Sequence, residues 1–125
     1  VSVGTEGGSE YFEQARLSRQ KSRDEALDTL QKSLKKANLS EEEKAELTAR
    51  LSMTVENITA ESDIENLVKA KGFVDCVAFL DDGKANITVQ TGAEGLQKEQ
   101  VAQIRDIVTS KSSVAAQDIT VVEVK

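Results

Sequence analysis

The chain has no histidine and only one cysteine, and these two shortages exclude most sites that are built from nitrogen and sulfur ligands. A zinc site of the usual type needs Cys or His ligands, and the Ser-His-Asp and Cys-His catalytic sets both need histidine. Cys76 lies in an apolar segment, where a free cysteine usually behaves as a small hydrophobic residue. Carboxylates are plentiful, but they mostly flank lysines or begin helices. We therefore expect no catalytic residue, no metal and no cofactor, and we interpret the chain as non-enzymatic.

Long apolar runs and an excess of positive charge are also missing. No run approaches the roughly 18 apolar residues that indicate a membrane-spanning helix. Sixteen basic residues against twenty-two acidic ones give a net charge of -6, which argues against nucleic acid as a partner. The chain does not begin with methionine, so we interpret it as a fragment or a processed piece. Membrane attachment is then expected only through an anchor that is absent from this chain.

The length of 125 residues predicts one domain with one core. Residues 1–9 contain three glycines and no apolar period, which predicts a flexible lead-in to a single domain over 10–125. A long helix is expected over 10–38, because Leu27, Leu30 and Leu34 recur at helical spacing.

A second helix is expected over 40–71. Ser40 and Glu43 have the spacing of a capping box at its start, and Gly72 fits the position after its last turn. Its apolar stripe can face that of the first helix in an antiparallel hairpin. β-branched residues over 54–59 weaken helix propensity, so a bend or a break is expected there.

Two strands are expected over 73–80 and 84–90, joined by the tight turn that Asp81-Asp82-Gly83 favours. Both faces of the first strand are largely apolar, which is typical of a strand at the centre of a sheet or covered on both sides. The second strand alternates Ala85, Ile87 and Val89 with polar residues, so one of its faces is expected to be wet.

A third helix over 96–112 and a last strand over 119–124 complete the pattern. The order α-α-β-β-α-β predicts an α+β fold in which helices pack on one face of a small three-stranded sheet. A crossover through the third helix favours an arrangement with the first strand in the middle and the second and third on either side of it.

A basic stripe interrupts this otherwise acidic chain. Arg16, Arg19 and Arg23 fall at i, i+3 and i+7 of the first helix. One interpretation is a solvated helix face that is paired with acidic residues of the same helix. The other is a docking edge for an acidic surface.

Three motifs of the sequence stand out together: the run from Tyr11 to Arg23, the capped start over 39–44, and above all the segment Ile64 to Phe73, which reads IENLVKAKGF. With these motifs the sequence resembles the stage III sporulation protein AH family. The closing helix and strand of the family fit as well. The resemblance covers nearly everything after Gly8, in the same order, while the family's N-terminal membrane anchor and linker are not represented.

This resemblance implies a role that composition does not show. Family members sit in the mother-cell membrane of endospore-forming bacteria, with this domain in the intermembrane space that faces the forespore. There they meet stage II sporulation protein Q and form part of a channel between the two cells. The domain is also similar to the ring-building modules of type III secretion and flagellar basal-body proteins, which implies self-association into a ring.

The resemblance and the predicted surfaces together suggest an envelope scaffold. Its hypothetical partner contacts are the arginine stripe, the hairpin and a second strand that is expected to lie at an edge: Arg16, Arg19, Arg23, Val77, Phe79, Asp82, Lys84, Asn86, Thr88 and Gln90. The alternative is a soluble α+β binding module with an unrelated protein or small-molecule ligand. That module would need a concave apolar pocket with a few converging polar groups.

Overall fold

A computed structural model describes residues 3–124 of the chain, with side-chain burial from Glu10 onward. In chain order the elements are α1 (Val3–Leu34), α2 (Glu41–Ala70), β1 (Asp75–Asp81), β2 (Lys84–Gln90), α3 (Lys98–Lys111), a short 3₁₀ helix η1 (Ala116–Asp118) and β3 (Ile119–Val124). Helices pack against a three-stranded sheet, which confirms the predicted α+β class and element order.

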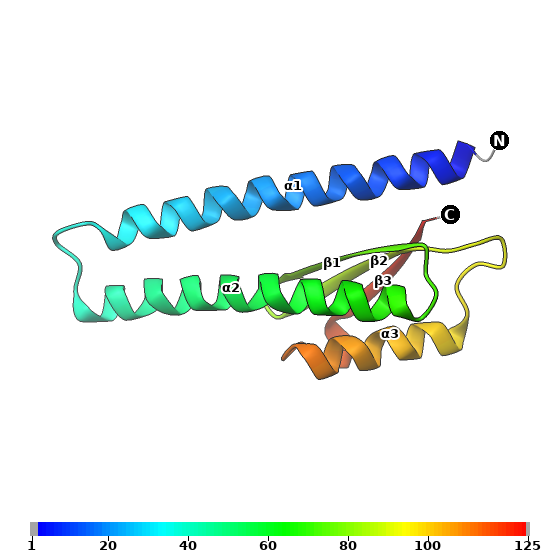
Figure 1. Cartoon of the computed structure of the whole chain (residues 1–125). Coiled ribbons are helices and arrows are strands. Elements are labelled where there is room, and N and C mark those ends of the chain that lie inside the picture. The colour runs from blue at the N-terminus through cyan, green and yellow to red at the C-terminus, as the bar shows by residue number, and fades with distance from the viewer. Residues whose placement is uncertain (1–2, 125) are drawn as a thin grey trace.

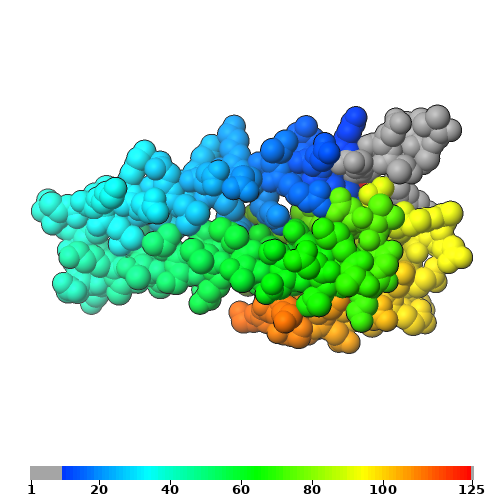
Figure 2. Space-filling view, in the orientation of Figure 1, coloured from blue at the N-terminus to red at the C-terminus, as the bar shows by residue number. Residues whose placement is uncertain are grey.

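The two long helices form an antiparallel pair, and α2 lies between α1 and α3 (Figure 1). The sheet lies against the C-terminal half of α2. The end of α1, the connection over 35–40 and the beginning of α2 extend past the sheet, so one end of the molecule consists of two helices alone (Figures 1 and 2).

The start of α1 differs from the prediction of a flexible lead-in over 1–9. The helix begins at Val3, so that prediction is wrong for residues 3–9, and residues 1–2 lie outside the described part. Glycine lowers helix propensity by about 1 kcal/mol per residue but does not block the backbone hydrogen bonds as proline does, and this segment has no proline. The helix can therefore extend backwards from Tyr11 and Phe12.

Helix α2 begins and ends where its capping residues indicate. The Ser40 hydroxyl accepts a hydrogen bond from the Glu43 amide, and the Glu43 carboxylate accepts one from the Ser40 amide. Gly72 has a φ of 107°, a conformation that favours glycine. No break occurs over the β-branched segment, because the next two turns are anchored by Ala60 and Ile64, which are buried.

The strand order is β1-β2-β3, with β1 antiparallel to β2 and β2 parallel to β3. The prediction that the first strand lies in the middle is therefore wrong, since β2 is central and β1 is an edge strand. The apolar residues on both faces of β1 have a different cause: α2 covers one face, and α1 also lies against this strand. The turn between β1 and β2 agrees with the sequence, because Asp82 and Gly83 both have positive φ.

The main core lies between one face of the sheet and the helices α2 and α3. Ile64 and Val68 of α2 meet Ile104 and Val108 of α3 there, and all four side chains are buried. The strands contribute the remaining buried members of this face: Cys76, Ala78, Leu80, Ala85, Ile87, Val89 and Ile119.

The opposite face of the sheet is only partly covered. Strand pairing places Val77, Thr88 and Val122 in one row across this face, and Phe79, Asn86 and Thr120 in the next row. In the first row Val77 is buried, Thr88 is half-buried and Val122 is exposed, and in the second row Phe79 is half-buried while Asn86 and Thr120 are exposed. We call the four residues Asn86, Thr88, Thr120 and Val122 the open face.

Candidate functional site

The arginine stripe of α1 is turned towards the free edge of β1. Arg23 forms an ion pair with Glu61 of α2 at 2.6 Å, and Arg19 forms one with Glu65 at 2.6 Å. Arg16 pairs with Asp75 of β1. The interpretation of these arginines as a solvated face paired within its own helix is therefore wrong, because their partners come from α2 and β1.

The same three guanidinium groups bind the outward carbonyls of β1. Arg16 donates to the Cys76 carbonyl at 3.4 Å, Arg19 donates to that of Ala78, and Arg23 donates to that of Leu80 at 2.9 Å. An edge strand leaves alternate carbonyls and amides unpaired. Three successive arginines thus satisfy three successive free carbonyls.

Acidic side chains satisfy the matching amides. The Ala78 amide donates to Glu65 at 2.8 Å and the Leu80 amide donates to Glu61 at 2.8 Å. The Cys76 amide donates to its neighbour Asp75 at 2.8 Å. We call this arrangement of six charged side chains on Cys76, Ala78 and Leu80 the closed edge.

Long arginine side chains compensate for the different rise per residue of the helix α1 and the strand β1. From Arg16 to Arg23 a helix rises roughly 10 Å, whereas the strand from Cys76 to Leu80 advances roughly 13 Å. The long flexible arginine side chains absorb this difference over three positions. Beyond the stripe the α1 residues that face inward are apolar, with Phe12 before it and Leu27 after it.

Glu61 is the most buried charged group at the closed edge, with 2% of its surface exposed. Burial removes water from the carboxylate and raises its pKa, and this effect outweighs the hydrogen bonds from the Leu80 amide and Arg23, which lower it. An uncompensated charge here is costly, so Arg23 and Glu61 depend on each other. The guanidinium carbon of Arg23 also lies 5.2 Å from the centre of the Phe79 ring.

Cys76 is buried beside this edge and has no sulfur partner. Burial, together with the nearby carboxylates of Glu65 and Asp75, raises the pKa of its thiol to about 12. A reactive cysteine requires a lowered pKa. The sulfur therefore acts as part of the core, as its apolar strand indicates.

The hypothetical partner contacts on the hairpin fall into different environments. Val77 and Gln90 are buried, Phe79 lies partly beneath Arg23, and Asp82 and Lys84 are exposed at the turn. Only Asn86 and Thr88 lie on the open face. Because β2 pairs with a strand on both sides, the interpretation of Asn86, Thr88 and Gln90 as an edge that accepts a strand is wrong.

The outer edge of β3 was not among the partner contacts predicted from the sequence. Within the described residues no strand pairs with that side of β3. The Val124 carbonyl accepts a hydrogen bond from Thr91, on the β2 side. Since inward and outward groups alternate along a strand, the amides and carbonyls of Val121 and Glu123 point to the free edge. We call this the open edge.

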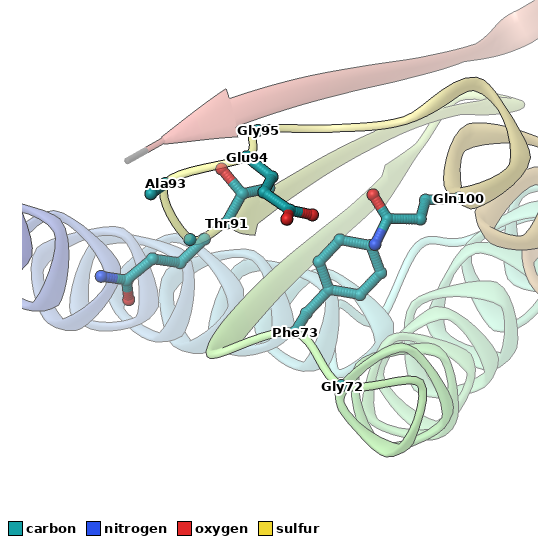
Figure 3. Close-up of a pocket in the computed structure, with 9 residues that line it drawn as sticks. Gly72, Phe73, Thr91, Ala93, Glu94, Gly95 and Gln100 are labelled. Carbon is teal, nitrogen blue, oxygen red and sulfur yellow. The ribbon is translucent and has the colours of Figure 1, made fainter.

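A shallow cavity of 260 Å³ lies beside the loop that follows β2. In Figure 3 the side chains of Phe73, Glu94 and Gln100 lie around it, and the other lining residues come from the turn after α2, the end of β2 and the loop. Ligand pockets usually enclose about 300–1,000 Å³. A larger hollow of 840 Å³ between α1, α2 and the hairpin turn is an open groove that mixes polar and apolar residues.

No group of three or more His, Cys, Asp or Glu side chains within residues 10–124 is arranged to hold a metal ion. Among the helices described, none combines the length and the apolar character that crossing a bilayer requires.

Comparison with known proteins identifies the family of this chain. The model of a family described as "SpoIIIAH-like protein" matches residues 1–121. The chain belongs to this family. The match confirms the family resemblance that the segment Ile64 to Phe73 suggested, and no match was found among curated protein sequences.

Two solved structures share the fold of this SpoIIIAH-like chain. One comes from "Structure of the SpoIIQ-SpoIIIAH pore forming complex", with 23% identity and a TM-score of 0.80 over 90% of this chain and 96% of the other. The second is the type III secretion system protein EscJ of enteropathogenic E. coli, with 23% identity and a TM-score of 0.53 over 74% of this chain and 62% of the other. At this level of identity both show the fold, and they confirm the predicted similarity to a secretion-system protein.

Proposed function

We propose that this domain is a non-enzymatic scaffold that binds a SpoIIQ-type partner and forms part of the channel between mother cell and forespore. Membership of the SpoIIIAH-like family supports this role, as does the fold shared with a chain from a SpoIIQ-SpoIIIAH pore-forming complex. The descriptions of both structural neighbours name assemblies rather than reactions.

The observation that carries the proposed mode of binding is the difference between the two sheet edges. Side chains hold every outward backbone group of β1 from Cys76 to Leu80, whereas no described residue pairs with the outward groups of Val121 and Glu123 on β3. Addition of a strand to an exposed edge is a common way to bind a protein segment, because backbone hydrogen bonds supply affinity. The partner strand is therefore expected at β3.

The open face extends this surface beside the β3 edge. Asn86, Thr88, Thr120 and Val122 form a patch of small, uncharged side chains on neighbouring strands. Such a patch accepts a packed surface without the cost of removing water from a charge. It lies directly beside the strand that the partner would extend, so both contribute to one continuous contact.

The test is light scattering coupled to size exclusion on this chain, alone and mixed with the soluble domain of the corresponding SpoIIQ protein. We expect a stable mixed complex whose mass is the sum of the components. Circular dichroism on the same samples verifies that both partners are folded.

Absence of a complex between folded partners would call for a second measurement with both proteins anchored to one membrane surface, because tethering raises the effective concentration to the millimolar range. If no association appears there either, the partner assignment is wrong. A complex that forms but leaves the β3 amides unchanged would contradict only the proposed edge.

The intermembrane location, attachment through an anchor outside this chain and assembly into a ring belong to the same proposal. The shared fold with EscJ, a secretion-system protein, supports the ring. A soluble module with an unrelated ligand is less well supported. Of the two hollows described above, one is smaller than most ligand sites and the other is an open groove.

A further inference from the structure

The surface that α1 covers is a receptor for an arginine-bearing helix, and we propose that a second copy of this chain can supply that helix by exchange of α1. This acidic trough consists of Glu61, Glu65 and Asp75 together with the outward carbonyls of Cys76, Ala78 and Leu80. The inference concerns β1 and is independent of the proposed contact at β3.

The chemistry of the trough restricts what can occupy it. A β-strand would need both the carbonyls and the amides of Cys76, Ala78 and Leu80, but two of these amides are already held by glutamates of α2, and the third by Asp75. Only hydrogen-bond acceptors and negative charges remain when α1 is absent. Guanidinium groups fit this surface, because each can donate to a carboxylate and a carbonyl at once.

The spacing of the donors restricts the partner further. Arg16, Arg19 and Arg23 lie on one side of a helix and meet alternate residues of a strand. A helix with the same three arginines is present in every copy of the chain. Charge and spacing therefore both point to α1 of a second molecule.

Packing holds α1 in place less firmly than α2 or α3. Among the side chains of α1 that the structure describes, only Phe12 is buried. Leu27, Leu30 and Leu34 are half-buried where the helix pair extends past the sheet. Charged contacts thus carry a large share of the attachment of α1.

The connection between α1 and α2 has no feature that enforces a sharp return. Residues 35–40 contain neither glycine nor proline, and none of them has a positive φ. The amides of Lys35 and Lys36 still donate to carbonyls of the last helical turn, at 3.2 Å each. This short segment can straighten without backbone strain, which separates α1 from its own trough.

The protein concentration then determines whether α1 occupies the trough of its own chain or that of a second copy. A helix tethered by six residues has a local concentration of about millimolar at its own trough, so one chain closes on itself in dilute solution. Exchange becomes competitive when the contact within one chain is weakened and the contact between chains is not.

A charge-swap experiment creates that condition at the half-buried pair Arg19–Glu65. One variant carries Arg19→Glu and the other carries Glu65→Arg, so each alone places like charges at its own closed edge. In a mixed dimer with exchanged helices, positions 19 and 65 carry opposite charges again, while Glu61, which lies 3.6 Å from Arg19 in the natural chain, is the same in every variant. Both variants also carry Val121→Pro, which removes association through the β3 edge.

We expect light scattering to show a one-to-one heterodimer that is at least about tenfold tighter than either homodimer, a difference of about 1.4 kcal/mol. Two folded variants that stay monomeric in the mixture would overturn the proposal. If either variant is unfolded alone, circular dichroism of the mixture decides, since recovery of helix on mixing supports exchange and no recovery contradicts it.

The matched control places both substitutions, Arg19→Glu and Glu65→Arg, in one chain together with Val121→Pro. This chain has complementary charges at its own closed edge and should remain monomeric under the same conditions. Dimerisation of the control to the same extent as the mixture would mean that the association does not depend on charge matching between chains.

Discussion

The two outer strands of this sheet, β1 and β3, differ in whether their outward backbone groups have hydrogen-bond partners. Both β1 and β3 have a row of backbone groups with no strand beside them. On β1, six charged side chains from α1, α2 and the strand itself satisfy the row from Cys76 to Leu80. On β3 no residue in the described part of the chain satisfies the row at Val121 and Glu123. An exposed edge invites pairing with other chains, so closing one edge confines that pairing to the other.

The closed edge combines hydrogen bonding with burial of charge. Glu61 and Arg23 have side chains that are 3% and 12% exposed, whereas Arg16 and Asp75 are 34% and 21% exposed. The Arg23 end of the closed edge is therefore expected to contribute most to stability. The Arg16 end contributes less, because water screens an exposed ion pair.

The largest expected effect is at Arg23. Arg23→Ala leaves Glu61 buried without its main partner and should lower the free energy of unfolding by roughly 3–5 kcal/mol in urea denaturation. Lys21→Ala is the matched control on the exposed side of α1, and its effect should lie within about 0.5 kcal/mol. Similar losses for both variants would show that the closed edge does not stabilise the fold.

The next effect concerns the open edge. Val121→Pro removes one outward amide and should weaken binding of the SpoIIQ-type partner by roughly tenfold or more, since a hydrogen bond and a clean backbone approach are both lost. Val121→Ala truncates the same side chain but keeps the amide, and it should bind nearly as well. Titration calorimetry distinguishes the two, and equal affinities for both variants would place the partner elsewhere.

A smaller effect appears in the pH dependence of stability. Burial raises the pKa of Glu61 in the folded chain, so the folded state holds more protons on this group than the unfolded state does between the two pKa values. Its contribution to stability is therefore greatest at low pH and declines as the pH rises from about 4.5 through the raised pKa. The slope from one group cannot exceed about 1.4 kcal/mol per pH unit.

The matched variant for this titration is Glu61→Gln, which keeps the shape and removes the ionisation. Urea denaturation at a series of pH values should show the declining component in the natural chain and not in the variant. A natural chain that instead gains stability relative to the variant over the same interval would contradict the assigned direction of the pKa shift.

The smallest effect is expected at Arg16. Its pair with Asp75 is about one-third exposed on the arginine side, so Arg16→Ala should cost no more than about 1 kcal/mol. Denaturation at raised salt concentration gives the complementary measurement. If Arg16→Ala lowered the free energy of unfolding as much as Arg23→Ala does, burial would not determine how much each ion pair of the closed edge contributes.

Local patterns in the sequence predicted the elements well. Ser40 and Glu43 fixed the start of α2, Gly72 its end, and the turn at Asp82 and Gly83 the hairpin. Each of these signals lies within a few residues of the structure it determines. The β-branched segment of α2 and the glycines near the start of α1 did not interrupt their helices, because packing and backbone hydrogen bonding override weak propensities.

Long-range relationships could not be predicted in the same way. The apolar faces of β1 indicated a central strand, yet a helix packed against an edge strand removes it from water as effectively as another strand does. The arginines of α1 showed their spacing but not their partners, which are 38 to 60 residues away along the chain. The i, i+4 spacing of Glu61 and Glu65 was the available signal, and it only becomes informative beside Arg16, Arg19 and Arg23.

Amide hydrogen exchange of the free chain, resolved by residue, tests the central claim most directly. We predict slow exchange at the Ala78 and Leu80 amides, because glutamate side chains hold them although β1 is an edge strand. The outward amides of Val121 and Glu123 should exchange fast. Equally fast exchange on both edges would contradict the account, since the charged side chains of the closed edge would then leave the β1 amides as exposed to water as those of β3.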